Sequence, residues 1–155
     1  MARIIWLTLN KNDSPHGDVV LSFGPAEQKE DSYYFTLDPH VAPNDESPAK
    51  AAKVMASLLE QWVARVSSEA DVYLPVGFSD QSMTWLHVAN SGSDVTLTLG
   101  WSEDEGWSIP PSDVGDQNPT DFQPMDDVES VTVYRPRLLS LLRSNQLDLL
   151  EAVAT

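Results

Sequence analysis

Residues 95–101 read Val-Thr-Leu-Thr-Leu-Gly-Trp, an alternation of apolar with small or polar side chains at a period of two. This pattern predicts a β-strand with one face on the core. The inward set would be Val95, Leu97, Leu99 and Trp101. Two stretches of strand length precede it, at 72–78 and 84–89, and residues 90–94 have the composition of a hairpin turn. The sequence therefore predicts three consecutive antiparallel strands.

Four more strands are expected outside this group. Residues 3–9, 18–23 and 32–37 lie on its N-terminal side and residues 128–134 on its C-terminal side, and these segments are rich in β-branched, aromatic and other apolar side chains. Both faces of residues 3–9 are apolar, so that strand is expected at the centre of a sheet that is covered on both sides.

Two helices are expected. Ser47 is a good N-cap and Pro48 suits a first helical turn, and both precede an apolar stripe at helical spacing, which predicts a helix over residues 47–66. Its polar face would carry Lys50, Lys53, Gln61 and Arg65. A second helix is predicted over 136–153, where Ser144-Asn145 could divide it in two. The whole chain, 1–155, is thus expected to be one α+β domain with a mainly antiparallel, twisted sheet of about seven strands.

The charge of the chain is unevenly distributed. Its net charge is −15, yet residues 1–65 carry only −3 and residues 135–155 carry +1. Residues 66–134 hold 13 acidic side chains and no Lys or Arg. An adaptation to high salt would spread acids over the whole surface, whereas a local concentration favours a surface that meets a partner.

Two segments carry much of this acidity. Residues 100–108, Gly-Trp-Ser-Glu-Asp-Glu-Gly-Trp-Ser, are expected to form a second hairpin with the acids at its tip. Trp101 continues an inward face and is assigned to the core, while Trp107 either packs against the protein or anchors a partner. Residues 110–127, with four prolines and no periodicity, are predicted to be a long acidic loop that is mobile in the free protein.

No catalytic motif is present. The chain lacks cysteine, a Gly-rich phosphate loop, a His-Glu-x-x-His motif and a Gly-x-Ser-x-Gly motif, so no catalytic residue and no cofactor are predicted and the chain is not expected to be an enzyme. His16 and His40 are expected in solvated loops. His87 lies in a predicted strand on the face of Trp85 and is expected to be buried and hydrogen-bonded.

A calcium site is the one metal site that the sequence raises. Four oxygen ligands fall within nine residues, but their spacing is not that of an EF-hand loop and the expected bidentate Glu is missing. These residues are Asp113, Asp116, Asn118 and Asp121. A solvated loop is favoured over a metal site.

The function that this pattern favours is inhibition of a basic partner, such as a nuclease toxin or another nucleic-acid-acting protein. Complementary charge speeds association and selects partners, and the same charge opposes direct binding to nucleic acid. In size, acidity, lack of cysteine and lack of catalytic motifs the chain is similar in general character to the immunity proteins that neutralise bacterial toxins and to DNA-mimic inhibitors. The predicted partner-binding residues are Glu103, Asp104, Glu105, Trp107, Asp113, Asp116, Asp121, Asp126 and Asp127.

Two other classes of function stay open. The chain could be a non-catalytic accessory or assembly domain of a phage or secretion system, in which the acidity serves only solubility. An enzyme that uses carboxylates of 103–127, or His87 with a neighbouring acid, is not favoured. The lack of a long apolar run and of cysteine is typical of a cytoplasmic protein.

Overall fold

A computed structural model gives the structure of residues 4–10 and 17–154, with side chains as far as residue 152. Arg3, at the predicted start of the first strand, and His16 lie outside these residues. Within them the chain forms eight strands and three helices. In chain order these are β1 (Ile5–Asn10), β2 (Asp18–Phe23), β3 (Ala26–Asp31), α1 (Tyr33–Thr36), α2 (Pro48–Ser67), β4 (Val72–Phe78), β5 (Met83–Ser91), β6 (Asp94–Ser102), β7 (Gln123–Pro124), β8 (Val131–Tyr134) and α3 (Arg135–Ala154).

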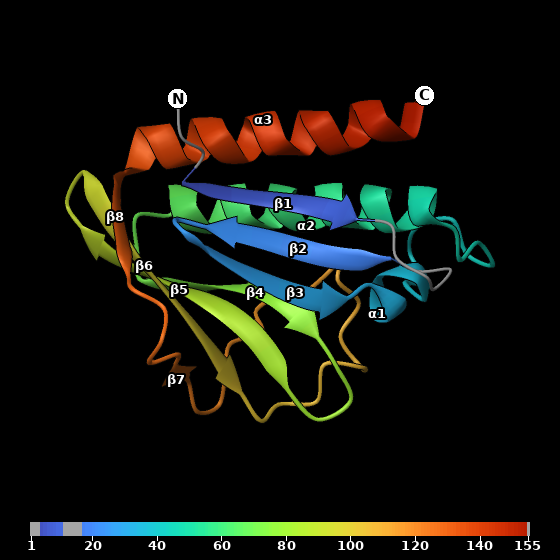
Figure 1. Cartoon of the computed structure of the whole chain (residues 1–155), viewed down its shortest axis with the longest axis horizontal. Helices are drawn as coiled ribbons and strands as arrows, with labels where there is room; N and C mark the ends of the chain where they lie inside the picture. Colours follow the sequence, from blue (N-terminus) through green and yellow to red (C-terminus); the bar gives the residue numbers. More distant parts are fainter. Residues whose placement is uncertain (1–3, 11–16, 155) are drawn as a thin grey trace.

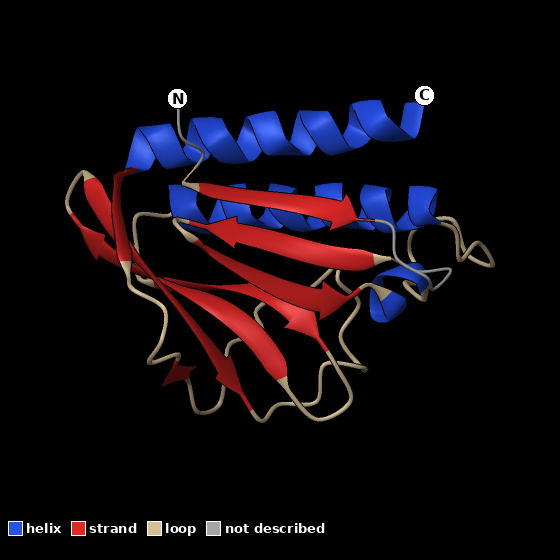
Figure 2. Ribbon diagram, in the orientation of Figure 1, coloured by secondary structure: helices blue, strands red, loops and turns tan. Residues whose placement is uncertain are grey.

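The strands form two antiparallel sheets rather than one. One sheet has the order β1-β2-β3, and the other has the order β4-β5-β6-β7, with β8 also paired to β6. Helix α2 passes behind the sheets and α3 runs along β1 at the far edge of the three-stranded sheet (Figures 1 and 2). The predicted antiparallel α+β class is confirmed, although the strands outnumber the seven expected.

The strand group around 95–101 is confirmed. Strands β5 and β6 pair residue by residue from Met83 opposite Ser102 to Ser91 opposite Asp94, and Gly92 takes a positive φ of 74° in the turn between them. Leu97 and Leu99 are 0% and 1% exposed. The expected strand 128–134 is shorter than predicted, because pairing with β6 begins only at Val131.

The segment 32–37 is not a strand. Residues 33–36 form the short helix α1, which buries Phe35 in edge contact with Phe78, with ring centroids 5.5 Å apart. The third strand of the three-stranded sheet is instead β3, which the sequence pattern did not predict. The chain turns at Gly24-Pro25 and pairs at once with β2, so that Phe23 lies opposite Ala26. The polar sequence of β3, Ala-Glu-Gln-Lys-Glu-Asp, hides it from a hydrophobic pattern, since its side chains are exposed or half-buried.

Helix α2 forms as predicted and its apolar stripe fills the core. The Ser47 hydroxyl accepts a hydrogen bond from the Lys50 amide at 3.3 Å, and Trp62 Nε1 donates to the Pro75 carbonyl at 2.9 Å. Lys50 was assigned to the polar face but is only 2% exposed, because segment 36–46 folds over the first turn of the helix. No described helix has the length and hydropathy of a membrane span.

Helix α3 differs from its prediction, and its contact with β1 shows that β1 is not a central strand. It is continuous from Arg135 to Ala154, because Asn145 does not break it but turns inward and is 1% exposed. The Leu7 amide donates to Asn145 Oδ1 at 2.6 Å, and Asn145 Nδ2 donates to the Leu7 carbonyl at 2.8 Å. Strand β1 is therefore an edge strand and not a central one, and a side chain supplies the hydrogen bonds that a neighbouring strand would otherwise make.

Replacing Asn145 by Ala should destabilise the protein by about 2–4 kcal/mol, since it leaves two buried backbone groups without partners. The measurement is the urea midpoint of unfolding, with Ser144→Ala, the exposed neighbour, as control. Equal midpoints for Asn145→Ala and the parent would show that the edge of β1 does not depend on this contact.

Candidate partner-binding site

The nine predicted partner-binding residues all lie in the loops between β6 and β8. Asp104 is half-buried and the other eight are exposed. The chain after β6 runs along the side of the molecule opposite α3 (Figure 1). The acidic side chains of 103–127 thus face solvent, while Val114 of the same segment is buried in the core.

The predicted hairpin over 100–108 is absent. Strand β6 ends at Ser102, and residues 103–106 have no regular structure. Trp101, which was assigned to the core, is 39% exposed, and Trp107 is 56% exposed. Trp101 continues the alternation of β6 and lies on the same face as Leu99. The strand paired with β6 at this point, β7, has only two residues, and the indole of Trp101 is exposed to solvent.

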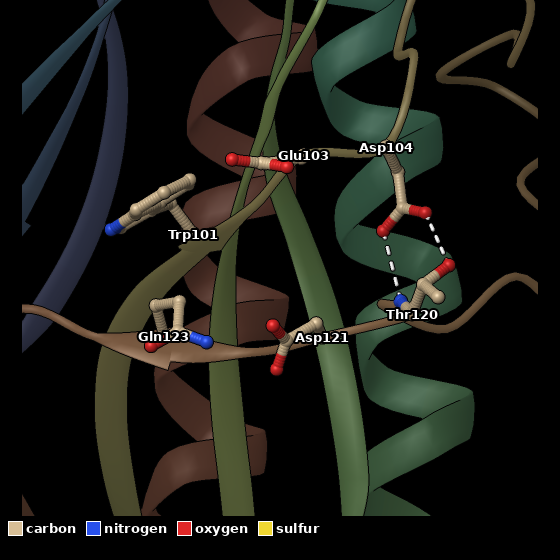
Figure 3. A pocket seen from close by; sticks show the side chains of 6 residues that line it. All are labelled: Trp101, Glu103, Asp104, Thr120, Asp121 and Gln123. Atoms are coloured by element: carbon tan, nitrogen blue, oxygen red, sulfur yellow. Dashed lines mark hydrogen bonds between the residues drawn. The ribbon is translucent and has the colours of Figure 1, made fainter.

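Six residues line a pocket at this end of β6 (Figure 3). They are Trp101, Glu103, Asp104, Thr120, Asp121 and Gln123. Only Glu103, Asp104 and Asp121 belong to the predicted set. Thr120 and Gln123 carry no signal in the sequence that would mark them, whereas Trp101 could have been found as a large aromatic residue beside an acidic run.

A clamp between two loops shapes this pocket. Asp104 Oδ2 accepts a hydrogen bond from the Thr120 amide at 2.9 Å, and Oδ1 accepts one from the Thr120 hydroxyl at 2.5 Å (Figure 3). Burial alone would raise the pKa of Asp104, but hydrogen bonds from Thr120 and Ser102 outweigh it and hold that pKa below its usual value. Asp104 is therefore a structural carboxylate, ionised at neutral pH.

Two glycines allow the close packing beneath the loops. A Cβ at Gly100 would lie 2.4 Å from the Phe122 ring and 2.5 Å from the Gln123 carbonyl oxygen, so the chain entering β7 passes directly over β6. A Cβ at Gly106 would lie 2.8 Å from the Ser79 amide nitrogen, and the Gly106 amide donates to the Ser79 carbonyl at 2.8 Å. The loop after β6 is thus seated against its neighbours.

The first part of the 110–127 loop is tied to helix α2. Gln61 accepts a hydrogen bond from the Val114 amide at 2.7 Å and donates to the Pro111 carbonyl at 3.0 Å. Arg65 donates to the Gly115 carbonyl at 2.6 Å. Burial lowers the pKa of Arg65 while Asp116 opposes the shift. These contacts tie residues 111, 114 and 115 to helix α2, and the mobility of 110–127 in the free protein stays a prediction.

The four possible calcium ligands do not share one site. Asp116 and Asn118 line a hollow beside Arg65, Asp121 lines the Trp101 pocket, and Asp113 is exposed. Within residues 4–10 and 17–152 no three His, Asp or Glu side chains are grouped as a metal site would require.

His87 differs from its prediction. It is half-buried, and its ring stacks on Tyr73 with centroids 4.6 Å apart and lies 5.8 Å from Phe122. Ring packing thus takes the place of the expected burial with a hydrogen bond. His40 is exposed, as predicted.

No family model matches the chain, and no curated protein matches it. One chain of the CdiA-CT/CdiI toxin and immunity complex from Enterobacter cloacae aligns with 91% of this chain over 96% of its own length, with a TM-score of 0.46 and 8% sequence identity. At that level of similarity the likeness carries no argument about function, which rests on the site itself.

Replacing Asp104 by Asn should loosen the pocket. The amide has one acceptor oxygen where the carboxylate has two, and it carries no charge, so Thr120 amide exchange should quicken by about tenfold, the effect of losing roughly 1.5 kcal/mol of charge-assisted hydrogen bonding. Since the pKa of Asp104 is lowered on folding, its contribution is full above its unfolded pKa and is lost as the pH falls through the folded value.

The parent should therefore approach Asp104→Asn in acid and differ from it at neutral pH. Hydrogen-exchange NMR at several pH values, corrected for intrinsic rates, measures this. Equal protection of Thr120 in both proteins at neutral pH would show that the clamp does not hold the loop.

Proposed function

We propose that this chain is a non-catalytic binding protein whose loops after β6 cover a basic surface of another protein. The observation that carries the proposal is the exposure, at one end of β6, of carboxylates and indoles together. Glu103, Glu105 and Asp121 are exposed there beside Trp101 and Trp107. Aromatic anchors within a charged rim are typical of surfaces that bind proteins.

The carboxylates of this surface are not neutralised within the described chain. None of Glu103, Glu105 and Asp121 lies in an ion pair with a described Lys or Arg. The bases that flank the acidic stretch in sequence point inward: Arg65 donates to the carbonyls of Tyr73 and Gly115, and Arg135 is 8% exposed. The field of this face is therefore negative and open to a partner.

The partner that fits this face is a protein with a basic, phosphate-binding surface, such as a nuclease toxin or another nucleic-acid-acting protein. Covering that surface would block its access to nucleic acid, so the chain would act as an immunity-type inhibitor. Repulsion between the face and phosphate opposes direct binding of nucleic acid. Complementary charge would mainly raise the rate of encounter.

Neutralising the exposed acids of the site should slow association with the partner. For the triple variant Glu103→Gln, Glu105→Gln and Asp121→Asn we expect a rate about tenfold lower at low salt, with the difference shrinking as salt rises. The partner is sought among proteins encoded beside this chain, and stopped-flow association at several salt concentrations gives the rates.

A matched control removes the same charge elsewhere. Glu27, Glu46 and Asp148 are exposed and bond to no described side chain, so Glu27→Gln, Glu46→Gln and Asp148→Asn should change the rate much less. Equal slowing by both triple variants, or an acidic partner, would leave the acidity as a solubility feature and overturn the proposal.

A further inference from the structure

We infer that the pocket at Trp101 receives one arginine side chain of the partner, an inference that rests on the proposed function and names the chemistry of its central contact. The starting observation is an exposed indole on a well-packed strand. Val95, Leu97 and Leu99, which precede Trp101 on the same face of β6, are at most 1% exposed, whereas Trp101 is 39% exposed. Tryptophan is among the residue types that are enriched at the centres of protein interfaces.

The groups around the indole are acceptors. Glu103 and Asp121 line the pocket with Trp101 and have no hydrogen bond to another described residue (Figure 3). Gln123 lies directly opposite Trp101 in the β6–β7 pair, so its amide borders the same opening. A side chain that enters beside the ring therefore meets two carboxylates and the Gln123 amide.

The pocket is formed in advance. Asp104 holds Thr120 through two hydrogen bonds, which fixes the segment that carries Asp121 and Gln123 relative to Glu103. The packing of Phe122 over Gly100 supports the same segment from below. A partner side chain would thus meet a preorganised site and would not have to order these loops.

Arginine satisfies this set of neighbours better than other side chains. Its planar guanidinium stacks on an indole and directs several donors toward neighbouring carboxylates at once. An apolar side chain would cover the carboxylates without pairing them, at a cost in desolvation. The ammonium of lysine is a compact, strongly hydrated point charge that does not stack on the ring.

The inference can be tested without the partner. The probes are capped tripeptides Gly-Arg-Gly, Gly-Lys-Gly and Gly-citrulline-Gly, citrulline being the neutral isostere of arginine. In ¹⁵N NMR at low salt, the Trp101 indole signal should shift saturably with the arginine peptide, at least fivefold more tightly than with the lysine peptide and not with citrulline. The Trp107 indole, whose Nε1 donates to Glu105 at 3.1 Å, is the internal reference.

The variants Glu103→Gln with Asp121→Asn should weaken arginine binding at least fivefold while the other indole signals keep their positions. Trp101→Phe should retain part of the binding that Trp101→Leu loses, which in these two variants is followed by the backbone amide signals of Glu103 and Asp121. An unshifted Trp101 signal, equal binding of lysine or citrulline, or equal shifts at Trp107 would overturn the inference.

The partner complex separates this inference from the proposed function. Trp101→Leu should speed dissociation at least tenfold and leave the salt dependence of association largely intact. If the salt-dependent association holds but Trp101→Leu dissociates at the parent rate, the arginine pocket is wrong and the proposed function stands. If the arginine peptide binds as expected but no basic partner depends on the acidic face, the proposed function fails.

Discussion

The pairing of β6 with three other strands is the constraint on which the rest of the structure depends. Its ladder with β5 spans residues 94–102, and its other edge is shared by β8 near the start and β7 near the end. The same strand places Leu97 and Leu99 in the core and Trp101 at the surface. Core and candidate site are therefore parts of one element, and the position of the indole is fixed by backbone hydrogen bonds rather than by a flexible loop.

Side chains link the two long helices to the strands and loops around them. Asn145 joins α3 to the open edge of β1, and Gln61 and Arg65 join α2 to the loop that follows β6. Both links satisfy backbone groups that no strand reaches, which is the general requirement on buried amides and carbonyls. The acidic loop can hence be long and irregular and still hold Asp104, Thr120 and Asp121 in defined positions.

Periodicity in the sequence predicts the elements whose burial is regular and misses those whose conformation depends on a neighbour. The alternation in 95–101 and the helical stripe of 47–66 are strong because one face of each is buried throughout. Strand β3 is polar and forms through a tight turn and pairing with β2, while the aromatic residues 33–35 are buried by a single helical turn. Nor does alternation reveal where the core ends, which is why Trp101 was assigned to it. The charge pattern of the sequence predicted which segment is acidic and exposed. It could not predict that Glu103, Asp121 and Gln123 line one pocket, because that depends on the hydrogen bonds between Asp104 and Thr120.

The central claim is that the loops after β6 are the surface that meets a basic partner. Hydrogen–deuterium exchange of the chain, free and bound to its partner, tests it most directly because it maps the contact without substitutions. The account predicts slower exchange in the complex at residues 101–107 and 119–123, with α3 and β1–β3 unchanged. Slowed exchange confined to α3 or to β1–β3, with residues 101–107 and 119–123 exchanging as in the free protein, would contradict it.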